Sequence, residues 1–437
     1  MSLIGGFLAD AYTGRFNMVM FASLVYLMGL SLLTMSQFIP SLKPCKTEIC
    51  RQPRKLHEVL LFVALYFISV GTGGHKPCLQ SFGADQFDDD HSEERKKKMS
   101  FFNWWNFALC CGLFLGVTVI VYVQDSVSWG VADLVLTITL AITIVTFYMG
   151  KYCYRYRVAQ GSPLIPMLQV LVAAIRKRNL PNPQNPDLLF EVPMEGFYFT
   201  QIGSDKAAII DREESENYQS CEQKHNPWRL ATLTRVEELK LILNMIPIWL
   251  TLLPNTVCLA QASTFFVKQA ATMNRNITNN FKIPPASIFS LGAIAMLVSV
   301  MVYDKVLVPM LRKATGNERG DAFALVGLQE YFYDQVPDSM RSLGVALYLS
   351  VIGVGSFLSS FLISVLDHVT EKYGRSWFGK DLSGSRLDNF FWLLAALNGL
   401  NLCVYGYLAR GYTYKNVDRR VALGDHSVTN GNDQFIG

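Results

Sequence analysis

Long apolar runs, separated by short polar stretches, set the pattern of this chain. A helix that crosses the hydrocarbon core of a bilayer needs about 20 predominantly apolar residues. Runs of that length predict eight membrane-spanning helices, at residues 16–39, 57–79, 101–123, 131–150, 241–266, 284–311, 343–366 and 390–409. The pattern therefore predicts an all-α integral membrane protein.

Two further apolar segments, residues 3–8 and 322–333, are too short to cross a membrane. We interpret both as the remaining ends of helices. The spans on either side of residues 322–333 have basic neighbours on the same side of the membrane, so this segment cannot cross. Because backbone exposed to lipid is unfavourable, the segment must be buried in protein or face water.

A long polar stretch, residues 151–237, divides the spans into two groups. We predict an N-terminal helix bundle at residues 1–150, a cytoplasmic linker at 151–237, a C-terminal bundle at 238–411 and a cytoplasmic tail at 412–437. Within the linker, the apolar residues 162–175 precede three basic residues. That pattern is typical of a helix lying in the membrane interface, although the basic residues could instead only anchor the linker.

Composition supports a multi-pass membrane protein, with 51% hydrophobic and 17% charged residues. Lysine and arginine near the span ends favour a cytoplasmic N-terminus. The net charge of +4 does not indicate a nucleic-acid partner, and we expect none. Nine cysteines, an odd number, do not predict a disulfide framework, although Cys45 and Cys50 share an external loop and could form a bridge.

The stretch GTGGHKPCLQSFGADQFD, residues 71–88, places Lys76 within an apolar run. An ammonium at membrane depth is unfavourable unless it is paired or lines a wet cavity, which makes Lys76 a candidate functional residue. Lys76 could alternatively extend toward the membrane interface. Gly71, Gly73 and Gly74 could serve close helix packing.

Other polar residues interrupt the apolar runs. Gln261 and Thr264 in one span, and Asn103 with Trp104 in another, could line a cavity. Lys240 follows Glu237 by three residues, a spacing that favours an ordinary surface pair over a gating role.

Patterns typical of catalytic sites are absent from the sequence. Six scattered histidines form no HExxH pattern, and there is no phosphate-binding glycine loop. We therefore predict no catalytic residues, no metal site and no cofactor, and a membrane-embedded enzyme is disfavoured. Asn276, Ile277 and Thr278 form an N-glycosylation sequon in an external loop, close to the predicted bilayer.

Several segments together resemble one family. They include GGFLADAYTGRF, LYFISVGTGGHKPCLQSFGADQFDDD, NPWRLATLTRVEELKLILNMIPIW and LVGLQEYFYDQVPDSMRSLGVALYLS. They are similar to plant members of the proton-dependent oligopeptide and nitrate transporter family, of the major facilitator superfamily. The resemblance implies twelve helices in two six-helix bundles around a central cavity, in the plasma or vacuolar membrane. It also implies proton-coupled, alternating-access transport of a small-molecule substrate such as nitrate, a short peptide or a hormone-like anion.

The resemblance also implies roles for individual residues. Lys76 would pair with an acid on the tenth helix, which falls on Asp321, although Asp321 could instead cap a helix. Asp10 and Arg15 would form an inside gate, or alternatively a static exposed ion pair. Nitrate carriers of the family that bind through a histidine on the seventh helix align it with Leu259, so a nitrate-specific role is doubtful.

The chain also departs from the family pattern. The first helix, with its ExxER motif, and most of the second have no counterpart. The ninth helix and the first half of the tenth are missing between Gly320 and Asp321. We therefore expect incomplete bundles, with about eight spans instead of twelve, and proton coupling impaired by the missing helices. The alternative is a non-transporting membrane fragment that binds or titrates a full-length relative.

Overall fold

The computed structural model describes residues 1–39, 41–42, 55–88, 91–157, 161–162, 164–179, 208, 228–278, 281–302, 305–306, 310, 325–373, 377–378 and 385–410. In this part of the chain, seven helices are long and apolar enough to cross a membrane. They span Arg15–Phe38, Lys55–Ala84, Ser100–Ser126, Trp129–Tyr152, Arg235–Thr272, Arg341–Lys372 and Leu387–Leu408. The predicted all-α membrane fold is confirmed.

The predicted span at residues 284–311 is the exception. Its described part is a 3₁₀ turn, Pro285–Ile288, followed by α11, Phe289–Val302. This apolar helix is shorter than a full span, and several residues between 303 and 311 lie outside the described residues. An eighth full span at residues 284–311 therefore stays a prediction, because part of it lies outside the described residues.

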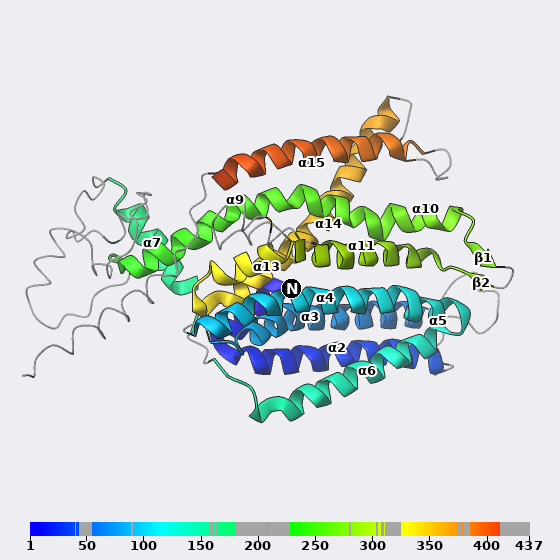
Figure 1. Ribbon diagram of the computed structural model, residues 1–437, viewed down its shortest axis with the longest axis horizontal. Helices are drawn as coiled ribbons and strands as arrows, with labels where there is room; N and C mark the ends of the chain where they lie inside the picture. The colour runs from blue at the N-terminus through cyan, green and yellow to red at the C-terminus, as the bar shows by residue number, and fades with distance from the viewer. Residues whose placement is uncertain are drawn as a thin grey trace, which may run out of the picture. The chain divides into compact units, whose positions relative to one another are not determined.

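The helices follow the predicted order (Figure 1). Besides α11, the α-helices are α1 Ser2–Leu8, α2 Arg15–Phe38, α3 Lys55–Ala84, α4 Ser92–Leu115, α5 Val121–Ser126, α6 Trp129–Met149, α7 Leu164–Arg176, α9 Leu233–Gln261, α10 Val267–Thr272, α13 Leu325–Asp334, α14 Arg341–Lys372 and α15 Leu387–Arg410. π-Helical turns lie at Ala9–Thr13, Gly116–Ile120 and Ala262–Phe266, and further 3₁₀ turns at Gly150–Tyr152 and Asp338–Met340. A two-stranded antiparallel hairpin, β1 Asn276–Thr278 and β2 Phe281–Lys282, follows α10. The hydropathy pattern did not predict this hairpin.

Two compact units make up the chain. The first contains Met1–Gly161, Ile248–Asp334 and Asp338–Val404, so membrane helices from before and after the linker belong to it together. The second contains Ser162–Pro247, with Gln335–Pro337 and Tyr405–Gly437. The division of the membrane helices into two bundles stays a prediction.

In the first unit, α1 and α2 pack closely against α3. A Cβ atom added to Gly5 would lie 2.6 Å from the Cα of Gly74, and one added to Gly71 would lie 2.7 Å from the backbone nitrogen of Tyr26. A side chain at either position would push the helices apart, because backbone atoms block it. The packing role proposed for these glycines therefore has a direct structural basis.

In the second unit, α7 forms where the sequence predicted an interfacial helix. Its buried residues Val170 and Ala173 share a hydrophobic cluster with Val236 and Leu239 of α9. The opposite face carries a row of exposed apolar side chains, which includes Ile165, Leu168 and Ile175. Contact between this row and a membrane stays a prediction.

Candidate functional site

A tight turn between α1 and α2 starts the candidate site. The π-helical turn Ala9–Thr13 ends at Gly14, whose φ of 76° lies in the left-handed region. Glycine adopts that conformation without the steric penalty that a Cβ atom brings. The turn brings the first residue of α2, Arg15, back toward Asp10, and the Nε atom of Arg15 donates to Oδ1 of Asp10 over 3.0 Å.

Arg15 also contacts a second acid, because its Nη1 atom donates to Oδ2 of Asp85, just after α3. The exposed fractions are 8% for the Arg15 side chain, 1% for Asp10 and 2% for Asp85. A charge withdrawn from water in this way requires a partner, and here one guanidinium serves two carboxylates. The pair predicted from Asp10 and Arg15 is therefore buried, unlike the exposed pair of the alternative interpretation.

Asp10 connects this turn to α14. Its Oδ2 atom accepts a hydrogen bond of 2.9 Å from the backbone N–H of Leu343, in the first turn of that helix. The first N–H groups of a helix have no partner within the helix, and a carboxylate at this end is stabilised by the helix dipole. Burial nevertheless raises the pKa of Asp10, although Arg15 and the Leu343 hydrogen bond act in the opposite direction.

Asp85 connects α3 to both α13 and α14. Tyr333 donates its hydroxyl proton to Oδ1 of Asp85 over 2.8 Å, and Nη1 of Arg341 donates to the Tyr333 hydroxyl oxygen over 3.1 Å. The Arg341 guanidinium carbon lies 4.8 Å from the centre of the Tyr333 ring. We call Asp10, Arg15, Asp85, Tyr333 and Arg341 the charge cluster. It joins elements from both sides of the predicted linker.

Residues beside the charge cluster reinforce it. Nζ of Lys98, on α4, lies 2.9 Å from Oδ1 of Asp334 and 5.2 Å from the centre of the Tyr333 ring. About one helical turn away, the amides of Gln80 and Asn106 both donate to Oε1 of Gln329, over 2.8 and 3.1 Å. We call these three residues the amide cluster. It joins α3 and α4 to α13.

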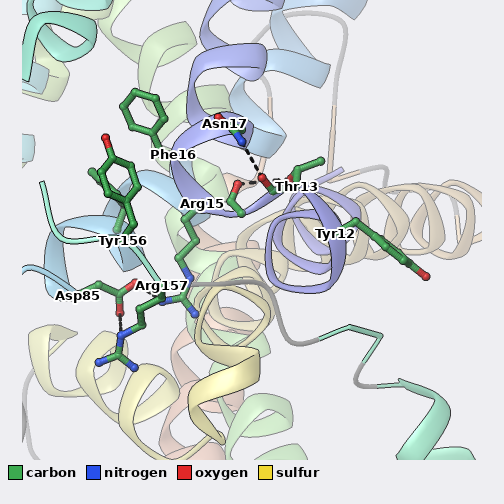
Figure 2. Close-up of a pocket in the computed structure, with 10 residues that line it drawn as sticks. Tyr12, Thr13, Arg15, Phe16, Asn17, Asp85, Tyr156 and Arg157 are labelled. Atoms are coloured by element: carbon green, nitrogen blue, oxygen red, sulfur yellow. Dashed lines mark hydrogen bonds and ion pairs between the residues drawn. The ribbon is translucent and has the colours of Figure 1, made fainter. Parts of the chain in front are cut away.

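A cavity of about 430 Å³ borders the charge cluster (Figure 2). Arg157 stands at its wall, with Nε 3.3 Å from Oδ1 of Asp85, and this ion pair is drawn in Figure 2. The other lining residues are Tyr12, Thr13, Gly14, Arg15, Phe16, Asn17, Phe82, Asp85 and Tyr156. The cavity therefore opens at the turn that carries Arg15.

The central candidate of the sequence, Lys76, lies apart from the charge cluster. It is exposed on α3, and the acid expected to pair with it, Asp321, lies outside the described residues. Nine residues separate Lys76 from Asp85, or roughly 14 Å along a helix. Gln80 of the amide cluster follows Lys76 by four residues, so both side chains lie on the same face of α3.

The other predicted candidates have different surroundings. Gln261 is buried, and its amide donates to Oγ of Ser359 over 2.7 Å and to the carbonyl of Val257 over 2.9 Å. It thus connects α9 to α14. Asn103 is half-buried on α4, and Thr264 is exposed with its hydroxyl donating to the carbonyl of Ala260.

Lys240 requires a correction. Its Nζ atom is 2.8 Å from Oε1 of Glu237, so the predicted pair exists, but the Lys240 side chain is only 4% exposed. The interpretation as an ordinary surface pair is wrong, because the neighbouring residues Val236 and Leu239 pack in the cluster with α7.

Three members of the charge cluster, Asp85, Tyr333 and Arg341, were not among the predicted site residues. All three occur in the quoted family segments, where they interrupt or border apolar runs. A polar residue at such a position was the signal available in the sequence. The residues near each of them in the sequence do not indicate that the three side chains meet. Within the described part of the chain, no group of three or more His, Cys, Asp or Glu residues could hold a metal ion.

Comparison with known proteins places these features in a family. The profile of the POT family matches residues 16–320. The chain belongs to the POT family. "Protein NRT1/ PTR FAMILY 5.7" of Arabidopsis thaliana is 50% identical, over 97% of this chain and 81% of its own length. "Protein NRT1/ PTR FAMILY 5.6" of the same plant is 51% identical, over 95% of this chain and 82% of its own length.

Solved structures agree with this fold. An auto-inhibited POT family peptide transporter has a TM-score of 0.58 at 16% identity, covering 95% of this chain and 86% of its own. The POT family transporter PepTSo also has a TM-score of 0.58, at 17% identity, covering 94% of this chain and 86% of its own. At these identities the likeness supports the fold alone. This POT family member is therefore a multi-pass membrane protein of a transporter family, and not an enzyme.

Proposed function

We propose that this POT family member is a secondary active transporter that couples a small-molecule substrate to protons by alternating access. Family membership supports the class of activity. The observation that carries the proposal is the charge cluster, which joins helices from both sides of the linker at the end predicted to be cytoplasmic. A contact of this kind can hold the inside of a carrier closed.

The distribution of charge suggests how such a gate opens. Arg15, Asp10 and Asp85 all belong to the N-terminal group of helices, so their ion pairs stay intact when the groups separate. The hydrogen bonds that Asp10 and Asp85 accept from the other group come from neutral donors, Leu343 N–H and the Tyr333 hydroxyl. Two ion pairs also cross between groups, Lys98 with Asp334 at 2.9 Å and Arg341 with Asp85 at 3.9 Å. Hydrogen bonds to charged acceptors contribute about 1.5–3 kcal/mol each. Opening the gate therefore breaks these hydrogen bonds and the two crossing ion pairs, while Arg15 keeps both of its carboxylate partners.

Lys76 is the proposed site for substrate or proton coupling. It shares a helix face with Gln80, whose amide already contacts α13. We propose that this face, farther along α3, borders the substrate path, with Lys76 pairing with Asp321 or with an anionic substrate. Gln261 and Asn103 are secondary candidates, and Lys240 is a candidate gating residue. The substrate class is nitrate, a short peptide or a hormone-like anion, in the plasma or vacuolar membrane.

One observation favours a second candidate function. The alignment with the first Arabidopsis relative runs over 491 positions, more than the 437 residues of this chain, so the relative has positions that this chain lacks. Missing helices would impair proton coupling. The alternative is a membrane protein that does not transport and instead binds a full-length relative.

Reconstituted uptake separates these functions. Proteoliposomes with an inward proton gradient would be offered nitrate, dipeptides and plant hormones, with the wild type compared with Lys76→Ala and Lys76→Arg. We expect gradient-dependent accumulation that Lys76→Ala abolishes. Absence of wild-type uptake of every substrate, in vesicles that contain correctly inserted protein, would refute the transporter proposal. Co-purification with a full-length relative would then favour the alternative.

A further inference from the structure

The β-hairpin after α10 has an ordered base. Residues Arg275 and Ile283 bracket it, and the Ile283 N–H donates to the Arg275 carbonyl over 3.0 Å. The guanidinium of Arg275 returns a hydrogen bond of 2.8 Å to the Ile283 carbonyl. These two hydrogen bonds close the base of the hairpin. Strand β1 begins at Asn276, shortly after the end of α10 (Figure 1).

Asn276, Ile277 and Thr278 form the only Asn-X-Ser/Thr sequence in the 437 residues of the chain. Both Asn276 and Thr278 are exposed. N-glycosylation requires this sequence on an accessible surface segment. We propose that Asn276 is an N-glycosylation site and that the β-hairpin faces the lumen of the secretory pathway and later the external side of the membrane.

The helix that precedes the β-hairpin is long enough to place the sequon beyond the hydrocarbon core. The helical segment Arg235–Thr272 has 38 residues. A rise of about 1.5 Å per residue makes it about 57 Å long, whereas the hydrocarbon core is about 30 Å thick. If the core begins just after Lys240, an upright helix leaves it near Gln261.

The rest of this helix extends beyond the core. It continues to Thr272 for roughly 16 Å more, and Lys268 on this part is exposed. A tilted helix would extend less far, but the β-hairpin still begins beyond Thr272. The helix therefore holds the sequon away from the hydrocarbon region, where a soluble domain of a transferase can reach it.

The proposed modification is a group transfer. Nδ2 of Asn276 attacks C1 of an oligosaccharide carried on a lipid pyrophosphate, and a C–N bond forms. The bond between C1 and the pyrophosphate oxygen breaks, and the lipid pyrophosphate leaves with the electron pair. One amide proton passes to a base of the transferase. The reaction requires no oxidant and no reductant.

A gel-mobility experiment tests the proposal. The full chain would be expressed in eukaryotic cells, and its membrane fraction treated with a peptide N-glycosidase. We expect one discrete downward shift for the wild type, and no shift for Asn276→Gln or Thr278→Ala. Thr278→Ser, which keeps the sequon, should retain the shift. Asn274→Gln, two residues before the hairpin, is the matched control and should also retain it.

Two results would overturn the proposal. One is a wild-type protein in the membrane fraction whose mobility the glycosidase does not change. The other is a shift that persists in Asn276→Gln, which would place the glycan elsewhere. If a variant fails to accumulate, digestion of the wild-type protein still tests the proposal. Neither result depends on substrate uptake, so this proposal and the transporter proposal can fail separately.

Discussion

Two positively charged side chains, Arg15 and Lys76, show opposite ways of placing charge in this membrane protein. Arg15 is buried between Asp10 and Asp85, and its charge is neutralised within the fold. Lys76 is exposed on α3, and its expected partner lies outside the described residues. A buried pair holds helices together, whereas an exposed cation is available to a substrate or a proton-linked acid. We propose that Arg15 holds helices together and that Lys76 serves substrate or proton coupling.

The largest effect is expected when the buried charge is removed. Arg15→Ala removes the guanidinium from buried Asp10, whereas Asp85 keeps Arg157 at 3.3 Å. Breaking a buried pair typically costs about 3–5 kcal/mol. We expect a strongly lowered midpoint of thermal unfolding in detergent. The matched control is Arg155→Ala, which removes a largely exposed guanidinium that pairs with Glu94 at 2.7 Å. Equal midpoints for the two variants would contradict the structural role assigned to Arg15.

Removal of a gate hydrogen bond is expected to have the next largest effect. Tyr333→Phe deletes the hydroxyl that donates to Asp85 and accepts from Arg341. Asp85 keeps Arg157 at 3.3 Å but loses the Tyr333 donor, and a hydrogen bond to a charged group contributes about 1.5–3 kcal/mol. Because the deleted hydroxyl crosses between helix groups, the variant should favour the inward-open form. Thiol labelling of a cysteine introduced at Asn17, which lines the cavity, would measure this shift.

The control for this labelling experiment is Tyr331→Phe, on the same helix but outside the charge cluster. Unchanged labelling in Tyr333→Phe, compared with the parent cysteine variant, would show that the hydroxyl does not hold the gate.

The dependence of stability on pH tests the Asp10 carboxyl. Burial raises the pKa of Asp10 above the usual value of 3.8, so the folded protein binds this proton at a higher pH than the unfolded chain does. As pH falls through the raised pKa toward 3.8, Asp10 should add stability relative to Asp10→Asn. Thermal unfolding of both proteins across that range measures the difference. Parallel pH profiles would mean that Asp10 titrates as an ordinary carboxyl.

Substitution of Lys76 should have the smallest effect on stability. A replacement at an exposed position typically changes the free energy of unfolding by no more than about 0.5 kcal/mol. We therefore expect Lys76→Ala to keep the unfolding midpoint of the wild type and to lose uptake. A lowered unfolding midpoint comparable to that of Arg15→Ala would show that Lys76 is a packing residue.

Local patterns determined much of this fold. Apolar runs of sufficient length predicted each of the seven spans that the structure describes, because hydrophobicity and helix length are properties of neighbouring residues. The short segment at residues 322–333 was also predicted to be buried in protein or face water, and Phe332 and Tyr333 of α13 are fully buried. The turn at Gly14 and the nearby pair of Asp10 and Arg15 were visible because only five residues separate the pair.

Tertiary structure decided which charges meet. Asp85 and Tyr333 are 248 residues apart, and Asp10 and Leu343 are 333 apart, so no local pattern could join them. The burial of Lys240 likewise depends on α7, which lies far from it in the sequence. Hydropathy places a helix in the membrane, but pairing of buried charges depends on how distant helices pack, because an ion pair requires atoms within a few ångströms of each other.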